Sequence, residues 1–338
     1  PRGFVGAGVD EPNAHVQLYS GAKTEPNAIA TSVELIEGLV ATSQNCWPSV
    51  SFDFGAINNL LNKFFPAGFY YKTFMWPKNF WYKIYEPIIR KAAGLGVAPL
   101  KPDPDRYEHK FEYCDVLIAG SGPSGLASAL AAAKNGARVI LAEDKPRFGG
   151  TLLTDEVTIG NKKGKDWADE TVSQLKSMPN VIVKNRSQVF GYYDHNMMVM
   201  FERTKDHIEN PSKFTPRQKL WYIRAKEVVV STGSIERPLV FGNNDRPGIM
   251  LASAAKEYMK VYGVLVGRKP IIFTNNDSAY DTAIEFKKNG IDPLVVDVRS
   301  NSESSVVKEA KNLNINIKFS YGIVNSKGYL RVNSATIG

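Results

Sequence analysis

The sequence is poor in cysteine and has no long hydrophobic run. Among its 338 residues only Cys46 and Cys114 carry a thiol, far apart and outside any C-x-x-C pattern. This excludes a dithiol redox motif and a four-cysteine iron–sulfur site within these residues, and both thiols are expected to be plain buried side chains. Since no stretch reaches about 18 apolar residues, no membrane-spanning helix is predicted.

The first residues also lack the features of a secretion signal. PRGFVGAGVDEPNAH has no apolar h-region, which favours a cytoplasmic protein, and its start without methionine indicates a truncated or processed N-terminus. The net charge of +8 comes from scattered lysines, the densest group being Lys162, Lys163 and Lys165. No recognition module for nucleic acid accompanies them, so a solvated surface or a basic face toward an acidic partner is expected.

The most informative segment is DVLIAGSGPSG, at residues 115–125. Val116–Ala119 is an apolar run that predicts a buried parallel strand, and LASALAAAKNG predicts a helix that ends at Gly136. The turn between them has three glycines at the G-x-G-x-x-G spacing, Gly120, Gly122 and Gly125.

Each of these glycines has a physical reason. Gly120 allows the tight turn out of the strand, Gly122 lets a pyrophosphate approach because it has no Cβ, and Gly125 lets the helix pack closely on the sheet. The start of the helix adds N–H groups and a positive dipole end. The pattern predicts a dinucleotide site; the alternative is a Rossmann-type turn that kept its shape and lost its ligand.

The next strand, Arg138–Ala142, ends at Glu143. An acid at this position accepts hydrogen bonds from an adenosine ribose and favours an unphosphorylated 2′-hydroxyl, hence FAD or NAD rather than NADP. RFGGTLL follows, in which Gly149 and Gly150 allow a backbone turn near the cofactor and Thr151 offers its hydroxyl and N–H.

The chain is expected to contain two or three domains in four stretches. Residues 1–44 predict a partial ferredoxin-like β domain without cysteines, with strands in HVQLYSG and ATSVELIEG. Residues 45–112 form an aromatic-rich connector that ends in a polar linker, KPDPDRYEHKFEY. Residues 113–235 are assigned to a dinucleotide-binding Rossmann domain, and residues 236–338 to a second, truncated Rossmann-like domain. The fold class is therefore α/β.

Aromatic residues are dense in the connector, over residues 64–85. We expect their rings to be buried against the Rossmann domains or a partner subunit rather than to form a cofactor box, because exposed rings would leave a large apolar patch. The rings concerned are those of Phe69, Tyr70, Tyr71, Phe74, Trp76 and Trp81.

The second Rossmann-like domain has a degenerate fingerprint. RKPIIFTNNDSAYDTAIEFKKNGIDPLVVDVRS predicts strand, turn, helix and strand, with Asp297 at the end of the second strand. Thr274, Asn276 and Ala279 occupy the glycine positions, and their side chains would crowd a pyrophosphate. We therefore expect an empty Rossmann shell. The STG at residues 231–233, which follows an apolar strand, is typical of the place where flavoproteins cross back past their cofactor.

The motifs together resemble a specific family. YEPIIRKAAGLG, EDKPRFGGTLL, STGSIERPLVFGNNDRPGIM and FTNNDSAYDTA, with the glycine fingerprint, are similar to the α subunit of heterotetrameric bacterial sarcosine oxidase, and the similarity runs through nearly all of the chain. The resemblance implies two FAD/NAD(P)-binding domains in a thioredoxin-reductase-like arrangement, with NAD bound in this chain. Because the family's α subunit is far longer, the chain is expected to be a fragment that is inactive alone.

The resemblance also implies partners and chemistry. In the family the substrate-oxidising FAD lies in the β subunit, an FMN lies at the α/β interface, and a tetrahydrofolate-binding domain follows the part that ends here at Gly338. Sarcosine and oxygen become glycine and hydrogen peroxide, and the one-carbon unit passes to tetrahydrofolate or leaves as formaldehyde. The implied partners are β, γ and δ subunits, with no nucleic acid and no membrane.

Carried over residue by residue, the resemblance and the fingerprint imply one set of cofactor contacts. The set is Gly120, Gly122, Ser124, Gly125, Glu143, Asp144, Gly150, Thr151 and Val189. No residue is expected to be catalytic or to bind a metal. The histidines are isolated in the sequence, at positions 15, 109, 195 and 207.

Two other interpretations stay open. One is the α-like subunit of a different amine dehydrogenase complex, such as one for proline or an opine. The other is a nucleotide-stabilised scaffold whose ligand never turns over. A folate domain after this region would favour sarcosine.

Overall fold

The structure is a computed structural model of the chain. It describes residues 4–9, 14–20, 23–44, 46–57, 68 and 73–338. The chain divides into two compact units, of which unit 2 comprises Pro104–Arg237 and Ala255–Arg268. Unit 1 comprises Pro1–Asp103, Pro238–Ala254 and Lys269–Gly338.

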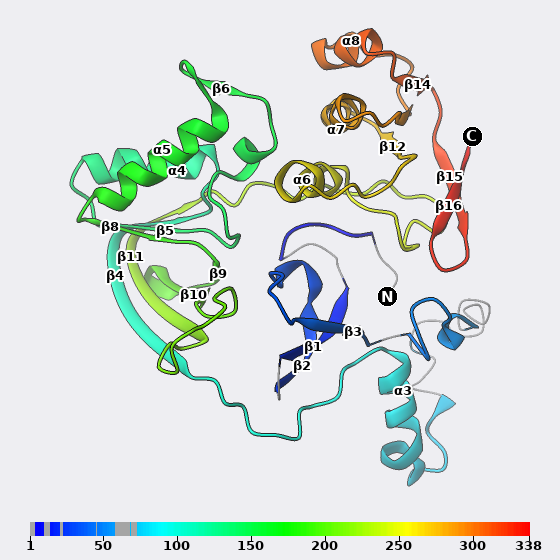
Figure 1. The fold of residues 1–338 in the computed structure, drawn as a ribbon, viewed down its shortest axis with the longest axis horizontal. Coiled ribbons are helices and arrows are strands. Elements are labelled where there is room, and N and C mark those ends of the chain that lie inside the picture. The colour runs from blue at the N-terminus through cyan, green and yellow to red at the C-terminus, as the bar shows by residue number, and fades with distance from the viewer. Residues whose placement is uncertain (1–3, 10–13, 21–22, 45, 58–67, 69–72) are drawn as a thin grey trace. The chain divides into compact units, whose positions relative to one another are not determined.

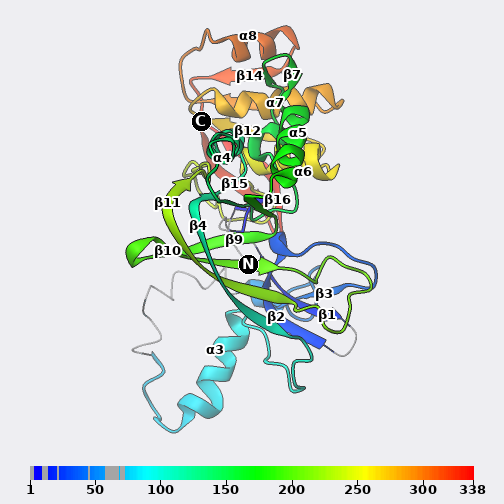
Figure 2. The same cartoon turned by 90° about the vertical axis from the view of Figure 1, so that its left-hand side faces the viewer.

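Unit 2 is built on a six-stranded sheet in the order β8-β5-β4-β11-β10-β9. Strands β8, β5, β4 and β11 run parallel, whereas β10 and β9 are antiparallel to their neighbours. β4 and β11 are long and lie side by side (Figure 2). The bounds are β4 (Tyr107–Ala119), β5 (Val139–Ala142), β8 (Val181–Lys184), β9 (Ser187–Tyr193), β10 (Met197–Arg203) and β11 (Gln218–Val230).

Helices α4 (Pro123–Lys134) and α5 (Gly164–Ser177) cover one face of this sheet (Figure 1). There they bury their apolar sides, including Leu126 and Leu175, against strand residues such as Ile118. The other face holds a second cluster around Leu117, Ile140, Met200, Trp221 and Ile223. The remaining elements are η5 (Gly150–Leu153), β6 (Thr158–Ile159), β7 (Lys162–Lys163), η6 (Asp194–Asn196) and, from Ala255 onward, α6 (Ala252–Tyr262).

The expected strand, turn, helix and strand of the fingerprint are present. α4 ends before Gly136, whose φ of +83° explains why the helix stops at a glycine. The assignment of residues 101–113 to a linker is wrong from Tyr107 onward, because β4 begins there. The first half of β4 does not pair with β5. It pairs with β11 instead, where Tyr107 lies opposite Gln218.

Unit 1 contains a second parallel sheet, in the order β12-β13-β14. Tyr280 and Phe286 of its first helix are fully buried. The bounds are β12 (Ile271–Thr274), α7 (Ser278–Lys288), β13 (Leu294–Asp297), α8 (Ser305–Asn312) and β14 (Asn316–Phe319), followed by the hairpin β15 (Ile323–Gly328) and β16 (Val332–Ile337). The expected α/β class with two Rossmann-like sheets is confirmed.

Three antiparallel strands lie near the N-terminus, β1 (His15–Ser20), β2 (Lys23–Ile29) and β3 (Val40–Ser43). HVQLYS is a strand as predicted. The prediction of a strand in ATSVELIEG is wrong, because this segment starts as a 3₁₀ turn, η1 (Ala30–Ser32), and the strands flank it.

The connector contains η2 (Phe54–Ile57), a π-helical turn η4 (Trp81–Tyr85) and α3 (Glu86–Ala92). Trp76 is 81% exposed, and its burial against the Rossmann domains or a partner subunit stays a prediction. Phe74 and Trp81 are half-buried. Phe69, Tyr70 and Tyr71 lie outside the described residues. None of the helices in the described part of the chain is long and apolar enough to cross a membrane.

Candidate dinucleotide site

Two of the fingerprint glycines are required by the packing of the backbone. Gly120 has a φ of +98°, and a Cβ there would lie 2.3 Å from the carbonyl oxygen of Ser231. A Cβ on Gly125 would lie 2.0 Å from the carbonyl oxygen of Gly120. The fold therefore demands glycine at both positions, whatever is bound.

Gly122 is different. It caps α4 with a φ of −63°, which any residue can adopt, and no described heavy atom lies within 4 Å of the place where its Cβ would be. The space beside it is open at the N-terminus of α4, where the first N–H groups of an α-helix have no intrahelical partners. A side chain at position 122 would point into that open space.

The loop after β5 lies against the glycine turn. The N–H of Gly149 donates to the carbonyl oxygen of Ser121 over 3.1 Å. A Cβ on Gly150 would come within 2.9 Å of the Cα of Gly122. Gly150 and Thr151 are exposed at the start of η5. The two segments that the sequence assigns to the cofactor are thus brought together.

Glu143 provides a buried carboxylate beside this turn. It is 6% exposed, and its Oε2 accepts hydrogen bonds from the N–H (2.9 Å) and the Oγ (2.5 Å) of Ser121. Its Oε1 accepts the N–H of Lys145 over 3.1 Å. Burial, as the largest cause, and the neighbouring Asp144 together raise the pKa of Glu143 from 4.5 to about 7, while the hydrogen bond from Ser121 opposes the rise.

The remaining predicted contacts surround this centre less closely. Ser124 is exposed in the first turn of α4, and Asp144 is half-buried next to Glu143. Val189 packs against the second hydrophobic cluster on β9. The start of that strand is tied to the site, because the N–H of Ser187 donates to the carbonyl oxygen of Glu143 over 2.7 Å.

Several features of the site were missed at the level of sequence. Ser121 is one, although a hydroxyl between two fingerprint glycines, with an acid at the end of the next strand, was a usable signal. Helix α6 is another: its Glu257 pairs with Lys145 (2.6 Å) and its Lys256 with Asp155 (2.8 Å). These ion pairs hold the loop between β5 and β6 at both of its ends.

In unit 1 the acid at the corresponding position, Asp297, already has hydrogen-bond donors from the protein. Asp297 is fully buried and accepts hydrogen bonds from Tyr280 Oη (2.7 Å) and Arg299 Nη2 (2.7 Å). Burial raises the pKa of Asp297, but these donors outweigh it and hold the pKa below its ordinary value. Arg299 also pairs with Asp277 (2.8 Å), at the start of α7. The carboxylate of Asp277 lies at the N-terminus of α7, where a pyrophosphate would bind, and its negative charge disfavours such a ligand. This supports the prediction of an empty shell.

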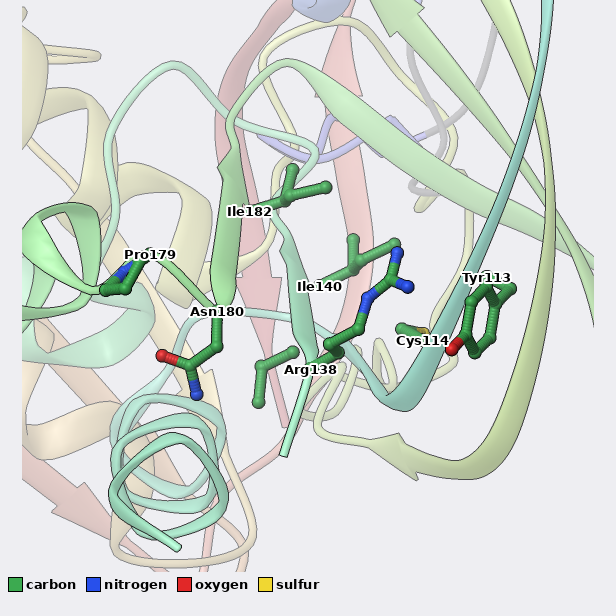
Figure 3. A pocket seen from close by; sticks show the side chains of 8 residues that line it. Tyr113, Cys114, Arg138, Ile140, Pro179, Asn180 and Ile182 are labelled. Atoms are coloured by element: carbon green, nitrogen blue, oxygen red, sulfur yellow. The ribbon is translucent and has the colours of Figure 1, made fainter. Parts of the chain in front are cut away.

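A cavity of about 460 Å³ lies elsewhere in unit 2 (Figure 3). It is at the amino ends of β5 and β8, whereas the glycine turn is at the carboxyl end of β4. Arg138 extends along it and stacks over the ring of Tyr113 at 4.1 Å. Burial raises the pKa of the lining Cys114 thiol to about 12, so this thiol is protonated and no nucleophile. The cavity is no part of the dinucleotide site.

A metal centre finds no support in the described ranges, which contain no group of three His, Cys, Asp or Glu side chains placed to hold an ion.

Fold and site together define a dinucleotide-binding domain of the flavoprotein oxidoreductase type. In agreement, residues 115–195 match the family of FAD dependent oxidoreductases. Among solved structures, L-proline dehydrogenase from P. horikoshii is similar, with 23% identity and a TM-score of 0.48, over 68% of this chain and 39% of that one.

More particularly, the chain is a homologue of sarcosine oxidase α subunits. It is 51% identical, over 88% of its length, to sarcosine oxidase subunit alpha of Rhizobium meliloti (strain 1021). It is 33% identical, over 91% of its length, to the subunit of the same name from Corynebacterium sp. (strain U-96). The chain spans 30% of the first relative and 28% of the second. The resemblance seen in the sequence is confirmed.

Proposed function

We propose that this chain is the NAD-binding part of the α subunit of a multi-subunit sarcosine oxidase. The observation that carries the proposal is the 51% identity to such an α subunit over 88% of the chain. The open N-terminus of α4 beside Gly122 and the buried carboxylate of Glu143 support the proposal, because dinucleotide sites use such features for the pyrophosphate and the ribose.

The carboxylate of Glu143 supports NAD over NADP. A buried acid beside a second acid, Asp144, accepts the hydroxyls of a ribose and repels a 2′-phosphate. The preference for NAD over FAD rests on the family resemblance alone, because both contain the same adenosine diphosphate.

In this proposal each element of the site has a role. The N–H groups of the first turn of α4, at Ser124 and Gly125, hold the pyrophosphate, and Gly122 gives it room. Gly150 and Thr151 contact it from the second loop, Glu143 and Asp144 bind the adenosine ribose, and Val189 contacts the nucleotide from β9. A nicotinamide dinucleotide can exchange a hydride when bound, but no residue of this chain is assigned a proton or hydride transfer.

The rest of the reaction belongs to the complex. We assign FAD to a β subunit, FMN to the α/β interface and tetrahydrofolate to a further part of the α subunit. The β, γ and δ subunits are the proposed partners. The complex would oxidise the CH–NH bond of sarcosine, yielding glycine and hydrogen peroxide, and pass the one-carbon unit to tetrahydrofolate or release it as formaldehyde.

The test is to purify the full-length protein with its neighbouring subunits. Nucleotides released from the separated α subunit would be identified, and peroxide formation would be measured with sarcosine, proline and an opine as parallel substrates. We expect NAD in the α subunit and peroxide with sarcosine. A yellow α subunit that releases FAD would refute the cofactor assignment, and activity with proline or an opine alone would refute the substrate.

A further inference from the structure

Ser121, between two fingerprint glycines, is fully buried and makes contacts that the dinucleotide fingerprint does not require. Both its N–H and its Oγ lie within hydrogen-bond distance of one oxygen, Oε2 of Glu143, at 2.9 and 2.5 Å. A carboxylate oxygen has two acceptor positions, so Ser121 alone fills Oε2.

The direction of the hydroxyl hydrogen follows from a third contact. The N–H of Gly149 is shared between two acceptors of Ser121, the carbonyl oxygen at 3.1 Å and Oγ at 3.2 Å, so Oγ accepts from it. A serine hydroxyl has one hydrogen, and the acceptor within reach of it is Glu143 Oε2. Ser121 thus donates to the acid while it accepts from the second cofactor loop.

We propose that Ser121 is a positioning residue for dinucleotide recognition: it holds Oε2 of Glu143 so that Oε1 and the neighbouring Asp144 face the adenosine ribose. The proposal rests on the proposed nucleotide function of this site. Without the hydroxyl, the carboxylate of Glu143 keeps the N–H groups of Ser121 and Lys145 as donors but loses its shortest hydrogen bond, so it is held less firmly. The carboxylate would then bind the ribose hydroxyls less well, while the contacts to the pyrophosphate would stay.

A purely structural role for Ser121 makes a different prediction. If the hydroxyl only stabilised the turn, its loss would weaken binding of any ligand that uses the turn, whether or not that ligand has ribose hydroxyls. The two roles are separated by comparing NAD with an NAD analogue that contains 2′,3′-dideoxyadenosine.

The experiment measures the dissociation constants of both ligands with the full-length protein, emptied of nucleotide, for wild type and Ser121→Ala. We expect Ser121→Ala to weaken NAD about tenfold, the effect of one hydrogen bond to a charged group, and to leave the analogue within about twofold of wild type. In a Glu143→Ala background the same substitution should have no further effect on NAD, because the two residues act through one contact.

Ser187→Ala is the matched control. Ser187 is equally buried and lies next to Glu143 in space, but its hydroxyl donates to the carbonyl oxygen of Asn185 over 2.8 Å. It should leave the ratio of the two dissociation constants unchanged. Ser121→Cys, which has a slightly larger side chain and only a weak donor, is a second variant should Ser121→Ala fail to fold; circular dichroism checks the fold.

Equal weakening of both ligands by the Ser121 variants, or an unchanged preference for NAD, would overturn the proposal while leaving the nucleotide function intact. Failure of the wild-type protein to bind NAD at all would instead overturn the proposed function.

Discussion

Gly120 and Gly122 stand two residues apart in one turn and meet different structural requirements. At Gly120 the chain bends with a positive φ and passes against the backbone of Ser231, so a side chain would collide with the protein itself. At Gly122 a side chain would point into open space. A substitution at position 122 therefore tests the ligand, whereas one at position 120 tests the fold.

We expect Gly122→Val to fold normally and to lose the nucleotide. A valine would occupy the space of the pyrophosphate, and the loss of two charge-assisted hydrogen bonds, each contributing roughly 1.5–3 kcal/mol, weakens binding by about two orders of magnitude or more. Nucleotide content per folded protein is the measurement. Gly267→Val is the control, since Gly267 also lies in unit 2 with no described atom within 4 Å of its Cβ position. Equal nucleotide content in both variants would contradict the assignment.

Because of the raised pKa of Glu143, we expect both stability and NAD affinity to depend on pH. Its pKa is raised from an ordinary value of 4.5 to about 7, so the folded protein without nucleotide loses stability as the pH rises from 4.5 to 7. Ribose hydroxyls donate to the ionised carboxylate, so binding releases a proton. NAD affinity should then increase with pH, by up to about tenfold per unit, and level off above about pH 7.

Titration calorimetry at several pH values measures this dependence. Glu143→Gln has a side chain of the same shape that does not titrate, and its affinity should be lower and independent of pH over this range. The assignment fails if the wild-type affinity falls as the pH rises, or if the variant keeps the wild-type slope.

At the scale of the element, the local sequence pattern was sufficient to predict a helix or strand that is stabilised by its own residues. DWADETVSQLKS places apolar residues at helical spacing, and α5 forms over that segment. β2 could not be predicted in this way: KTEPNAI contains proline and charged residues, and it becomes a strand by pairing with β1, with a left-handed residue at Asn27. The same holds for the first half of β4, which depends on the distant β11.

The candidate site follows the same division. Strand, glycine turn and helix are consecutive in the chain, so the fingerprint predicted them, and Glu143 follows one strand later. The contact between Ser121 and Glu143 and the passage of Ser231 behind Gly120 join residues that are far apart in sequence. No local pattern gives those distances.

Helix α5 offers a prediction about stability. Leu175 is fully buried between α5 and the sheet, so Leu175→Ala leaves a cavity and should lower the free energy of unfolding of unit 2 by about 2–5 kcal/mol. Ser173→Ala, on the exposed face of the same helix, should change it by less than about 0.5 kcal/mol. Urea unfolding followed by circular dichroism gives both values. A similar effect of the two substitutions would show that α5 does not pack as described.

At the scale of the molecule, the chain has two compact units, each with its own parallel sheet. Since each unit has its own core, we expect two unfolding transitions rather than one. NAD binds to the folded form of unit 2, and at 100 times its dissociation constant it should stabilise that unit by about 2.7 kcal/mol.

Calorimetry of the 338-residue chain, combined with hydrogen exchange, assigns the transitions. NAD should raise the midpoint of one transition and slow the exchange of β4 and β5, while β12 and β13 are unaffected. Slower exchange in β12 and β13 alone would place the nucleotide in unit 1 and contradict the assignment of its shell as empty.

The contrast between Gly120 and Gly122 has a consequence for evolution. If a lineage stopped using its nucleotide, selection for folding would still remove substitutions at positions 120 and 125, because the backbone itself leaves no room there. Position 122 would no longer be under selection for cofactor binding, so other residues, small or large, could replace its glycine. Glycine at positions 120 and 125 is thus kept by the fold alone. Replacement of the glycine at position 122 would identify a descendant that no longer binds a cofactor.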